Sequence, residues 1–307
     1  MVAFDLGSNT LRAVKFDCQK RERVKEYEKI VKTADGLQES GEIKKITIEK
    51  IVEAIKEAKK FVDAKDDEVV AVTTAALRIA SNSEKVLKII KKETGVEFKI
   101  ISGTEEANYT ALAVSERLKK LGLQNEDFLL LDLGGGSSEV YIKKEQRSFI
   151  KSFPIGIVTL TQKYNSVEQM QESLECETKE IKKFVGEIYS NFSKPKLFVS
   201  TAGTATTLAS FKLGIDYEHY DHSKVTGMFL SVGDIKSALS KLLSMDEDER
   251  NRWVGVGRSD LIISGISILL KIFQITDFSS LVVIDDGLRE GIAIEKCNEL
   301  EANIGYL

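Results

Sequence analysis

Two short stretches of the sequence place an aspartate just before a small turn that contains glycine. They are DLGSNT at residues 5–10 and DLGGGSS at residues 132–138. In such a turn, successive backbone N–H groups can point into one concavity, and glycine permits positive φ angles and the close approach of a phosphate. The two turns therefore indicate phosphate binding, although an ordinary β-hairpin turn is the alternative for either stretch taken alone.

Asp5 and Asp132 each end an apolar run that is typical of a buried strand. A buried carboxylate is costly unless it is paired, hydrogen-bonded or bound to a cation. Next to turns that hold phosphate, the two carboxylates favour Mg2+, bound directly or through water. The alternative is that each aspartate only accepts hydrogen bonds from its own turn.

The stretch ISGTEEA, residues 101–107, contains a candidate general base. Ser102 and Glu105 form a capping-box pattern, so Glu105 has a structural task at the start of a helix. Glu106 lacks that task and precedes Ala107 of the apolar stripe, so we expect it beside the buried face, where it can activate a water molecule. An acid favoured only by the helix dipole is the alternative.

Two further stretches contain weaker signals. Gly203 and Thr204 in STAGTATTLA lie at a junction between a strand and a helix, where free N–H groups can bind an anion. IDDGLREG, residues 284–291, repeats this arrangement, but Arg289 and Glu290 can also be a simple surface pair. GGGSSEV lacks the lysine and spacing of a P-loop and opens a strand, so neither a P-loop nor a dinucleotide fingerprint fits.

The elements that must position these residues occur in two similar sets. The first set consists of three β-rich runs at 2–7, 11–17 and 26–33. The second set begins with a strand, a glycine turn and a strand at 128–142, and its third run is at 146–154. Apolar spacing predicts helices at 47–63, at 103–121 and from about 167 to 192, the last with a capping box that begins at Ser166. The repeat predicts a duplicated α/β fold with the two turns facing a cleft.

Length and composition are consistent with two globular domains. Domains cluster at roughly 100 to 200 residues, and the chain has 307. A net charge of −4 gives no global attraction for DNA or for an anionic membrane, and the apolar run at 260–273 is shorter than a membrane span. Cys18, Cys176 and Cys297 are few and far apart, so we expect reduced thiols. Without a signal-like N-terminus, the expected location is cytoplasmic.

In their order along the chain, these motifs resemble those of the exopolyphosphatase and guanosine pentaphosphate phosphohydrolase family, in the superfamily of actin, the heat-shock ATPases and the sugar kinases. The resemblance covers nearly the whole sequence. The segments that carry it are DLGSNTLR at 5–12, TTAALRIASN at 73–82, ISGTEEA at 101–107, DLGGGSSEV at 132–140, FPIGIVTL at 153–160, GTATTLA at 203–209 and GLREG at 287–291.

The resemblance implies an α/β fold of two duplicated ribonuclease-H-like domains around a central cleft. We place these domains at 1–120 and 121–291, with a C-terminal helix at about 292–307 that can pack back on the first. The implied activity is Mg2+-dependent release of terminal phosphate from inorganic polyphosphate or guanosine pentaphosphate, with water activated by Glu106. The expected phosphate ligands are Gly7, Ser8, Asn9, Arg78, Gly134, Gly135, Gly136, Ser137, Gly203 and Thr204, and the expected metal ligands are Asp5, Asp132 and Glu139.

Two other functions remain open at this point. One is a kinase of the same superfamily, and the other is a sensor that binds guanosine tetra- or pentaphosphate without turnover. Long members of the family carry further helical domains that this sequence lacks after Leu307, so we expect a short polyphosphate or a nucleotide as substrate. A homodimer is one option for the assembly, and no DNA or membrane partner is expected.

Overall fold

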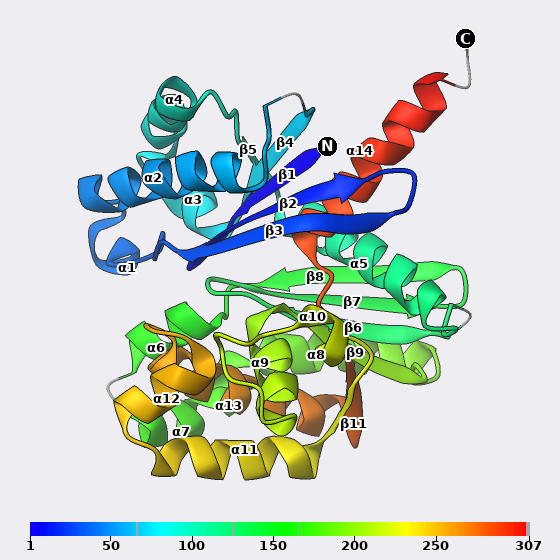
Figure 1. Ribbon diagram of the computed structural model, residues 1–307. Coiled ribbons are helices and arrows are strands. Elements are labelled where there is room, and N and C mark those ends of the chain that lie inside the picture. The colour runs from blue at the N-terminus through cyan, green and yellow to red at the C-terminus, as the bar shows by residue number, and fades with distance from the viewer. Residues whose placement is uncertain (66, 125, 165, 305–307) are drawn as a thin grey trace. The chain divides into compact units, whose positions relative to one another are not determined.

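The computed structural model describes residues 1–65, 67–124, 126–164 and 166–304, and it divides into two compact units (Figure 1). The first unit contains Met1–Ser115 together with the C-terminal segment from Asp286, and the second contains Glu116–Asp285. The sequence pattern places these boundaries after residues 120 and 291, whereas the contacts place them after 115 and 285. The segment that begins at Asp286 therefore belongs to the first unit.

The first unit is built on a five-stranded sheet in the order β3-β2-β1-β4-β5. β1 pairs antiparallel with β2 and parallel with β4, and all five of its residues are buried. A central strand covered on both faces is expected to be apolar throughout, as VAFDL is apart from Asp5. The strands are β1 Val2–Leu6, β2 Thr10–Asp17, β3 Glu22–Ile30, β4 Val69–Thr73 and β5 Lys99–Ile100.

The sheet of the second unit repeats this topology. Its order is β10-β11-β9-β6-β7-β8, so β6, β7 and β8 form the same antiparallel meander and β9 and β11 continue it in parallel. The short strand β10 is an addition at one edge. The strands are β6 Phe128–Leu133, β7 Ser138–Lys144, β8 Arg147–Phe153, β9 Leu197–Thr201, β10 Phe229–Ser231 and β11 Ser280–Val283. The duplicated α/β class predicted from the sequence is therefore confirmed.

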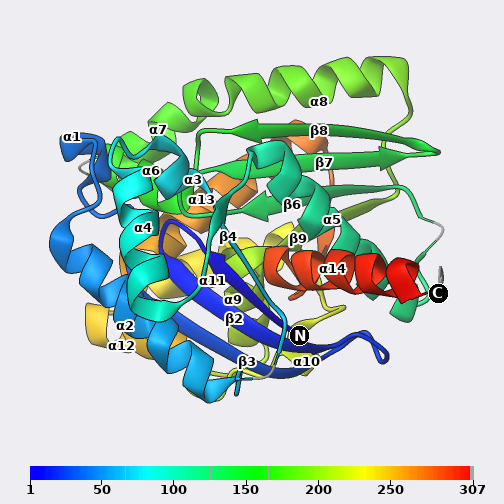
Figure 2. The ribbon, with the colours of Figure 1, turned by 90° about the horizontal axis from the view of Figure 1, so that it is seen from above.

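The helices of the first unit include both the helix that carries Glu106 and the last helix of the chain. They are α1 Leu37–Ser40, α2 Lys45–Phe61, α3 Ala75–Ile79, α4 Ser83–Thr94, α5 Gly103–Lys120 and α14 Leu288–Ile304. α14 packs against β1 and β2 through a buried apolar cluster that includes Ala3, Val14 and Ile292, and Figures 1 and 2 show it beside these strands. α5 crosses the boundary between the units, with Glu106 on the side of the first.

The helices of the second unit enclose an apolar core. They are α6 Ile157–Lys163, α7 Val167–Glu177, α8 Lys179–Asn191, α9 Ala202–Lys212, α10 His222–Val225, α11 Val232–Ser244, α12 Glu247–Val254 and α13 Ser259–Thr276. Figure 2 shows α8 running beside β8. The single helix predicted from about 167 to 192 is wrong, because the chain leaves the helical conformation at Thr178, although Ser166 caps its start as expected.

α13 is long and apolar enough to cross a membrane by length and composition alone. However, 67% of its most apolar window is buried within the protein. Its buried residues belong to the core of the second unit, against α6, α7 and α11. This is the pattern of a core helix.

The prediction of reduced thiols is wrong for two of the three cysteines. Cys18, in the turn after β2, forms a disulfide with Cys297 of α14, and 279 positions separate the two residues in the sequence. Cys176 has a free thiol and is exposed. The spacing of the cysteines could not reveal the pair, because their proximity depends on α14 packing back on the first sheet.

Candidate active site

The two glycine turns have the same corner geometry. In the first turn, Gly7–Thr10, the Gly7 N–H donates to the Thr10 carbonyl at 3.0 Å; in the second turn, Gly134–Ser137, the Gly134 N–H donates to the Ser137 carbonyl at 3.0 Å. The expected use of positive φ angles is wrong, since none of the described glycines with positive φ lies in either turn. In the second turn glycine relieves crowding, because a Cβ on Gly134 would lie 3.0 Å from the Ser137 oxygen.

Two carboxylates of the second unit lie on neighbouring strands. Asp132 of β6 is paired in register with Glu139 of β7, so both side chains are on one face of the sheet. Glu139 is buried, and one of its oxygens accepts a hydrogen bond from the Ser152 hydroxyl at 2.7 Å. Two neighbouring carboxylates are a donor set that suits a hard divalent cation.

The fit to Mg2+ depends on ligands other than side chains. In the described part of the chain, no three His, Cys, Asp or Glu side chains gather as for a metal site. Mg2+ commonly takes one or two carboxylates and completes its shell with water and substrate phosphates, which suits the pair Asp132 and Glu139. Asp5 is buried in β1 of the first unit, and its membership of the same metal site stays a prediction.

The neighbouring acids Glu105 and Glu106 lie in different surroundings at the start of α5. Ser102 and Glu105 form the predicted capping box: the Ser102 N–H donates to Glu105 at 2.9 Å, and the Glu105 N–H donates to the Ser102 hydroxyl at 3.1 Å. The Ser102 N–H, the Lys99 ammonium and the Ser102 hydroxyl together lower the pKa of Glu105 to about 2. Glu106 is only 9% exposed, and its backbone N–H donates to the Ser102 carbonyl at 2.9 Å.

The structure brings Arg78 and Glu106 together. Arg78 lies on α3, and its Nη1 is 3.5 Å from Glu106 Oε2 and donates to the Ile101 carbonyl at 2.7 Å. Its side chain is 27% exposed, and that of Glu106 is 11% exposed. The sequence patterns suggested separate roles for these two residues, and neither pattern indicated that they touch.

The third predicted phosphate site is the junction of β9 and α9. No atom lies within 4 Å of a Cβ built on Gly203, whereas the Thr204 hydroxyl is buried and faces Gly265 of α13. Any anion contact at Thr204 would therefore come from its backbone N–H. Ala202, which precedes Gly203, has a φ of 67°, a costly conformation for alanine that often accompanies functional sites. The sequence gives no signal for this strain.

The interpretation of Arg289 and Glu290 as a surface pair is wrong. Glu290 is 1% exposed, Arg289 Nε lies 2.6 Å from its Oε1, and Arg23 Nε lies 3.3 Å from the same atom. Glu26 accepts from Arg289 at 2.7 Å, and Arg23 also contacts Asp286 at 3.6 Å. These five residues form an ion network, named here the β3–α14 network, in which Glu26 is 38% exposed and the other four side chains are buried.

Charge compensation keeps the centre of this network ionised. Burial raises the pKa of the Glu290 carboxyl, but the charges of Arg289 and Arg23 outweigh it and lower the pKa to about 2. One turn along α14, Gly291 lies so close to α5 that a Cβ would be 1.9 Å from the Tyr109 carbonyl oxygen. The start of α14 is therefore bound to β3 by ion pairs and packed against the helix that carries Glu106.

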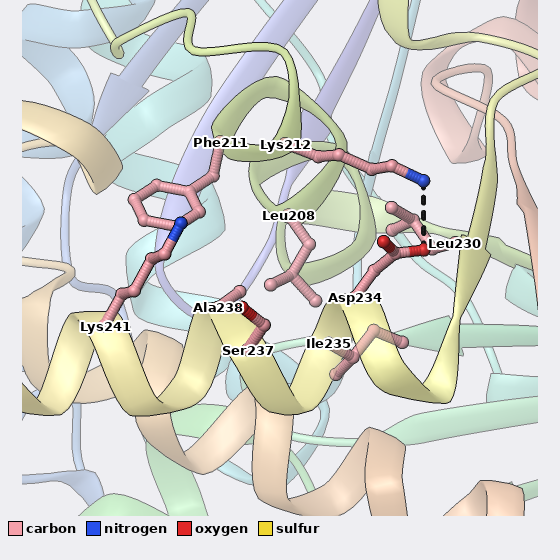
Figure 3. Close-up of a pocket in the computed structure, with 9 residues that line it drawn as sticks. All are labelled: Leu208, Phe211, Lys212, Leu230, Asp234, Ile235, Ser237, Ala238 and Lys241. Atoms are coloured by element: carbon pink, nitrogen blue, oxygen red, sulfur yellow. Dashed lines mark hydrogen bonds and ion pairs between the residues drawn. The ribbon is translucent and has the colours of Figure 1, made fainter.

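A small pocket lies elsewhere in the second unit, between α9 and α11 (Figure 3). Its volume is about 170 Å3, and its apolar floor includes Leu208, Leu230 and Ile235. Lys212 and Asp234 close one side with an ion pair of 2.9 Å. None of the residues predicted to bind phosphate or metal lines this pocket.

Comparison with known proteins places the chain in a family. The model of the Ppx/GppA phosphatase family matches residues 15–300, which is most of the sequence, so the chain belongs to this family. Exopolyphosphatase 1 of Mycobacterium tuberculosis (strain ATCC 25618 / H37Rv) is 27% identical over 305 residues, covering 95% of this chain and 86% of that protein. Exopolyphosphatase 1 of Mycobacterium leprae (strain TN) is 25% identical, and the match covers 95% of this chain and 88% of that protein.

Solved structures support the same assignment. The crystal structure of the Aquifex aeolicus member of the Ppx/GppA family is 31% identical, with a TM-score of 0.74 and 97% of both chains covered. An exopolyphosphatase from Cytophaga hutchinsonii ATCC 33406 has a TM-score of 0.84 at 21% identity, again over 97% of both chains, and shows the shared fold. The expected family and its actin-like fold are therefore confirmed.

Proposed function

We propose that this chain is a Mg2+-dependent phosphohydrolase that releases the terminal phosphate of inorganic polyphosphate. The observation that carries the proposal is the Glu106 carboxylate, 9% exposed at the capped start of α5, with the Arg78 guanidinium 3.5 Å away. Family membership and the relatives named exopolyphosphatase support the choice of substrate.

The proposed reaction needs little covalent work from the protein. Glu106 accepts a proton from water while the water oxygen forms a bond to the terminal phosphorus, and the bond from that phosphorus to the bridging oxygen breaks. The shortened polyphosphate leaves with the bridging oxygen and its negative charge. Arg78 supplies a planar set of donors that suits a phosphate next to the base.

Asp132 and Glu139 are the residues that would hold Mg2+ in the second unit. When bound, the ion would neutralise part of the phosphate charge. The backbone N–H groups of the second turn and of Gly203 would hold phosphate oxygens, because amides at a turn or a helix N-terminus suit anions. Guanosine pentaphosphate contains the same terminal phosphoanhydride bond, so we propose it as a second substrate.

Replacement of the general base tests the proposal directly. Glu106→Gln keeps the size of the side chain and removes its basicity, so kcat for phosphate release from polyphosphate is expected to fall about 1,000-fold. Free phosphate is measured with Mg2+ and, in separate reactions, polyphosphate, guanosine pentaphosphate or ATP with candidate acceptors. Omission of Mg2+ is expected to abolish release by the wild type.

Glu105→Gln is the matched control, because the neighbouring acid caps the helix. It is expected to lower the melting temperature slightly and to keep kcat within about twofold. Equal release by wild type and Glu106→Gln would remove Glu106 as the base. Phosphate on an acceptor would support the kinase, and guanosine pentaphosphate binding without release from any substrate would support the sensor.

A further inference from the structure

The second turn rests on the first residues of α6. The Ile157 N–H donates to the Gly134 carbonyl at 3.0 Å, and the N–H groups of Val158 and Thr159 donate to the Gly135 carbonyl at 2.8 and 3.3 Å. The first N–H groups of a helix lack partners within the helix, so they are free to bind these carbonyls. The start of α6 therefore fixes the direction of two consecutive carbonyl groups in the turn.

The direction of these carbonyls determines where the following amides point. In a trans peptide, the C=O of one residue and the N–H of the next point to opposite sides, and no described peptide bond is cis. Since the Gly134 and Gly135 carbonyls face α6, the N–H groups of Gly135 and Gly136 face away from it. Two successive amides thus point to the same side, as in backbone sites that bind anions.

The close approach of α6 depends on Gly156. A Cβ on Gly156 would lie 2.4 Å from the Gly135 oxygen, 2.5 Å from the Gly135 carbonyl carbon and 2.7 Å from the Gly136 nitrogen. Its own N–H is held by the Thr159 hydroxyl at 2.9 Å, which in turn donates to the Gly156 carbonyl at 3.1 Å. Any side chain at this position must push the turn and α6 apart.

We propose that Gly156 is a positioning residue for phosphate binding: by letting α6 hold the Gly134 and Gly135 carbonyls, it aims the Gly135 and Gly136 amides at the phosphate. The identity of the ligand rests on the proposed function. The direction of the amides rests only on the hydrogen bonds described above. Gly156 itself touches no substrate in this proposal.

Gly156→Ala is the principal test, with tripolyphosphate as substrate and inorganic phosphate as ligand. Two misdirected amides are expected to raise KM for tripolyphosphate about tenfold, while kcat changes less than about threefold because Glu106 is unaffected. The affinity for inorganic phosphate, measured by calorimetry with Mg2+, is expected to fall by a similar factor. In amide NMR spectra, the Gly135 and Gly136 signals of the wild type should shift on addition of phosphate.

Gly186→Ala is the matched control, because no atom lies within 4 Å of a Cβ at Gly186 of α8. It is expected to keep KM, kcat and phosphate affinity and to raise the melting temperature slightly. Thr159→Val provides a second variant if Gly156→Ala does not fold, since it removes the hydroxyl that holds Gly156 without adding a clash. It is expected to raise KM about threefold.

Three results would overturn the proposal: unchanged phosphate affinity in Gly156→Ala despite a lower melting temperature, equal effects in Gly186→Ala, or Gly135 and Gly136 signals that phosphate leaves unmoved in the wild type. The binding and NMR measurements do not require turnover. If the wild type releases no phosphate from any substrate, the proposed function fails, while phosphate binding still decides the role of Gly156.

Discussion

The two units share a sheet topology but are held together differently. In each sheet a three-strand meander continues into two parallel strands, and a tight turn joins the first two strands of the meander. Both units have an extensive apolar core. In the first unit, the Cys18–Cys297 disulfide and the β3–α14 network add two specific links to the apolar cluster at α14. The two units therefore share a topology but not the same set of stabilising interactions.

The two turns also differ in the segment that packs against them. After the third strand of each meander the chain returns to the turn: the Ala34 N–H donates to the Ser8 carbonyl at 2.8 Å, as the Val158 N–H donates to the Gly135 carbonyl. In the first unit the returning segment is a loop, and the turn keeps the side chains of Ser8 and Asn9. In the second it is a helix start in close contact, which only glycine permits.

Glu290→Ala should produce the largest difference between the units. Removal of a buried carboxylate that contacts two arginines is expected to cost about 3–5 kcal/mol in the free energy of unfolding at pH 7. Because the folded-state pKa is about 2, below the ordinary 4.5, the wild type keeps this stabilisation above about pH 4.5 and loses it as the pH falls towards 2. The difference between wild type and variant, measured by denaturant unfolding, should shrink over that range.

Glu299→Ala on the same helix is the control, because the side chain of Glu299 is 56% exposed in its pair with Lys296. It is expected to change stability by less than about 0.5 kcal/mol. Hydrogen exchange should locate the effect of Glu290→Ala in β3 and α14 and leave the core of the second unit protected. A uniform loss of protection over both units would contradict the contrast drawn between them.

Loss of the disulfide should have the next largest effect. Cys18→Ser, or reduction of the wild type, is expected to lower the free energy of unfolding by roughly 2–4 kcal/mol, because the link closes most of the chain into a loop. Melting temperatures with and without reductant measure this, together with the mass of the oxidised protein. Cys176→Ser should change neither the free energy of unfolding nor the melting temperature. If reductant does not change the melting temperature of an oxidised sample, the disulfide does not stabilise the protein.

The smallest expected effect comes from substituting the first glycine of each turn. A Cβ on Gly134 would lie 3.0 Å from a backbone oxygen, whereas on Gly7 the nearest contact is an ordinary 3.5 Å. Gly134→Ala is therefore expected to raise KM for tripolyphosphate about fivefold, and Gly7→Ala less than about twofold. Steady-state kinetics of both variants at equal Mg2+ measure the ratio. Equal increases in KM for the two variants would contradict the expectation that the shorter contact at Gly134 makes the second turn more sensitive to a side chain.

Much of the fold could be predicted because its signals are local. The strands around both turns, the helix of Glu106 and the Ser102–Glu105 cap each depend on residues within a few positions of one another. The long helix expected after Ser166 failed at Thr178, whose hydroxyl donates to the Leu174 carbonyl in a break that apolar spacing does not reveal. The surface interpretation of the Arg289–Glu290 pair failed because Glu26, which pairs with Arg289, and Arg23, which pairs with Glu290, come from β3.

The sequence by itself determined the duplicated Asp-Leu-Gly turns, the family, and the Ser102–Glu105 cap that precedes Glu106. Only the tertiary structure decided that Arg78 contacts Glu106, that Cys18 meets Cys297, and that Gly156 backs the second turn. The physical reason is the range of the interactions. Periodicity and capping act over one or two turns of chain, whereas these contacts exist only after strands and helices distant in sequence have packed together.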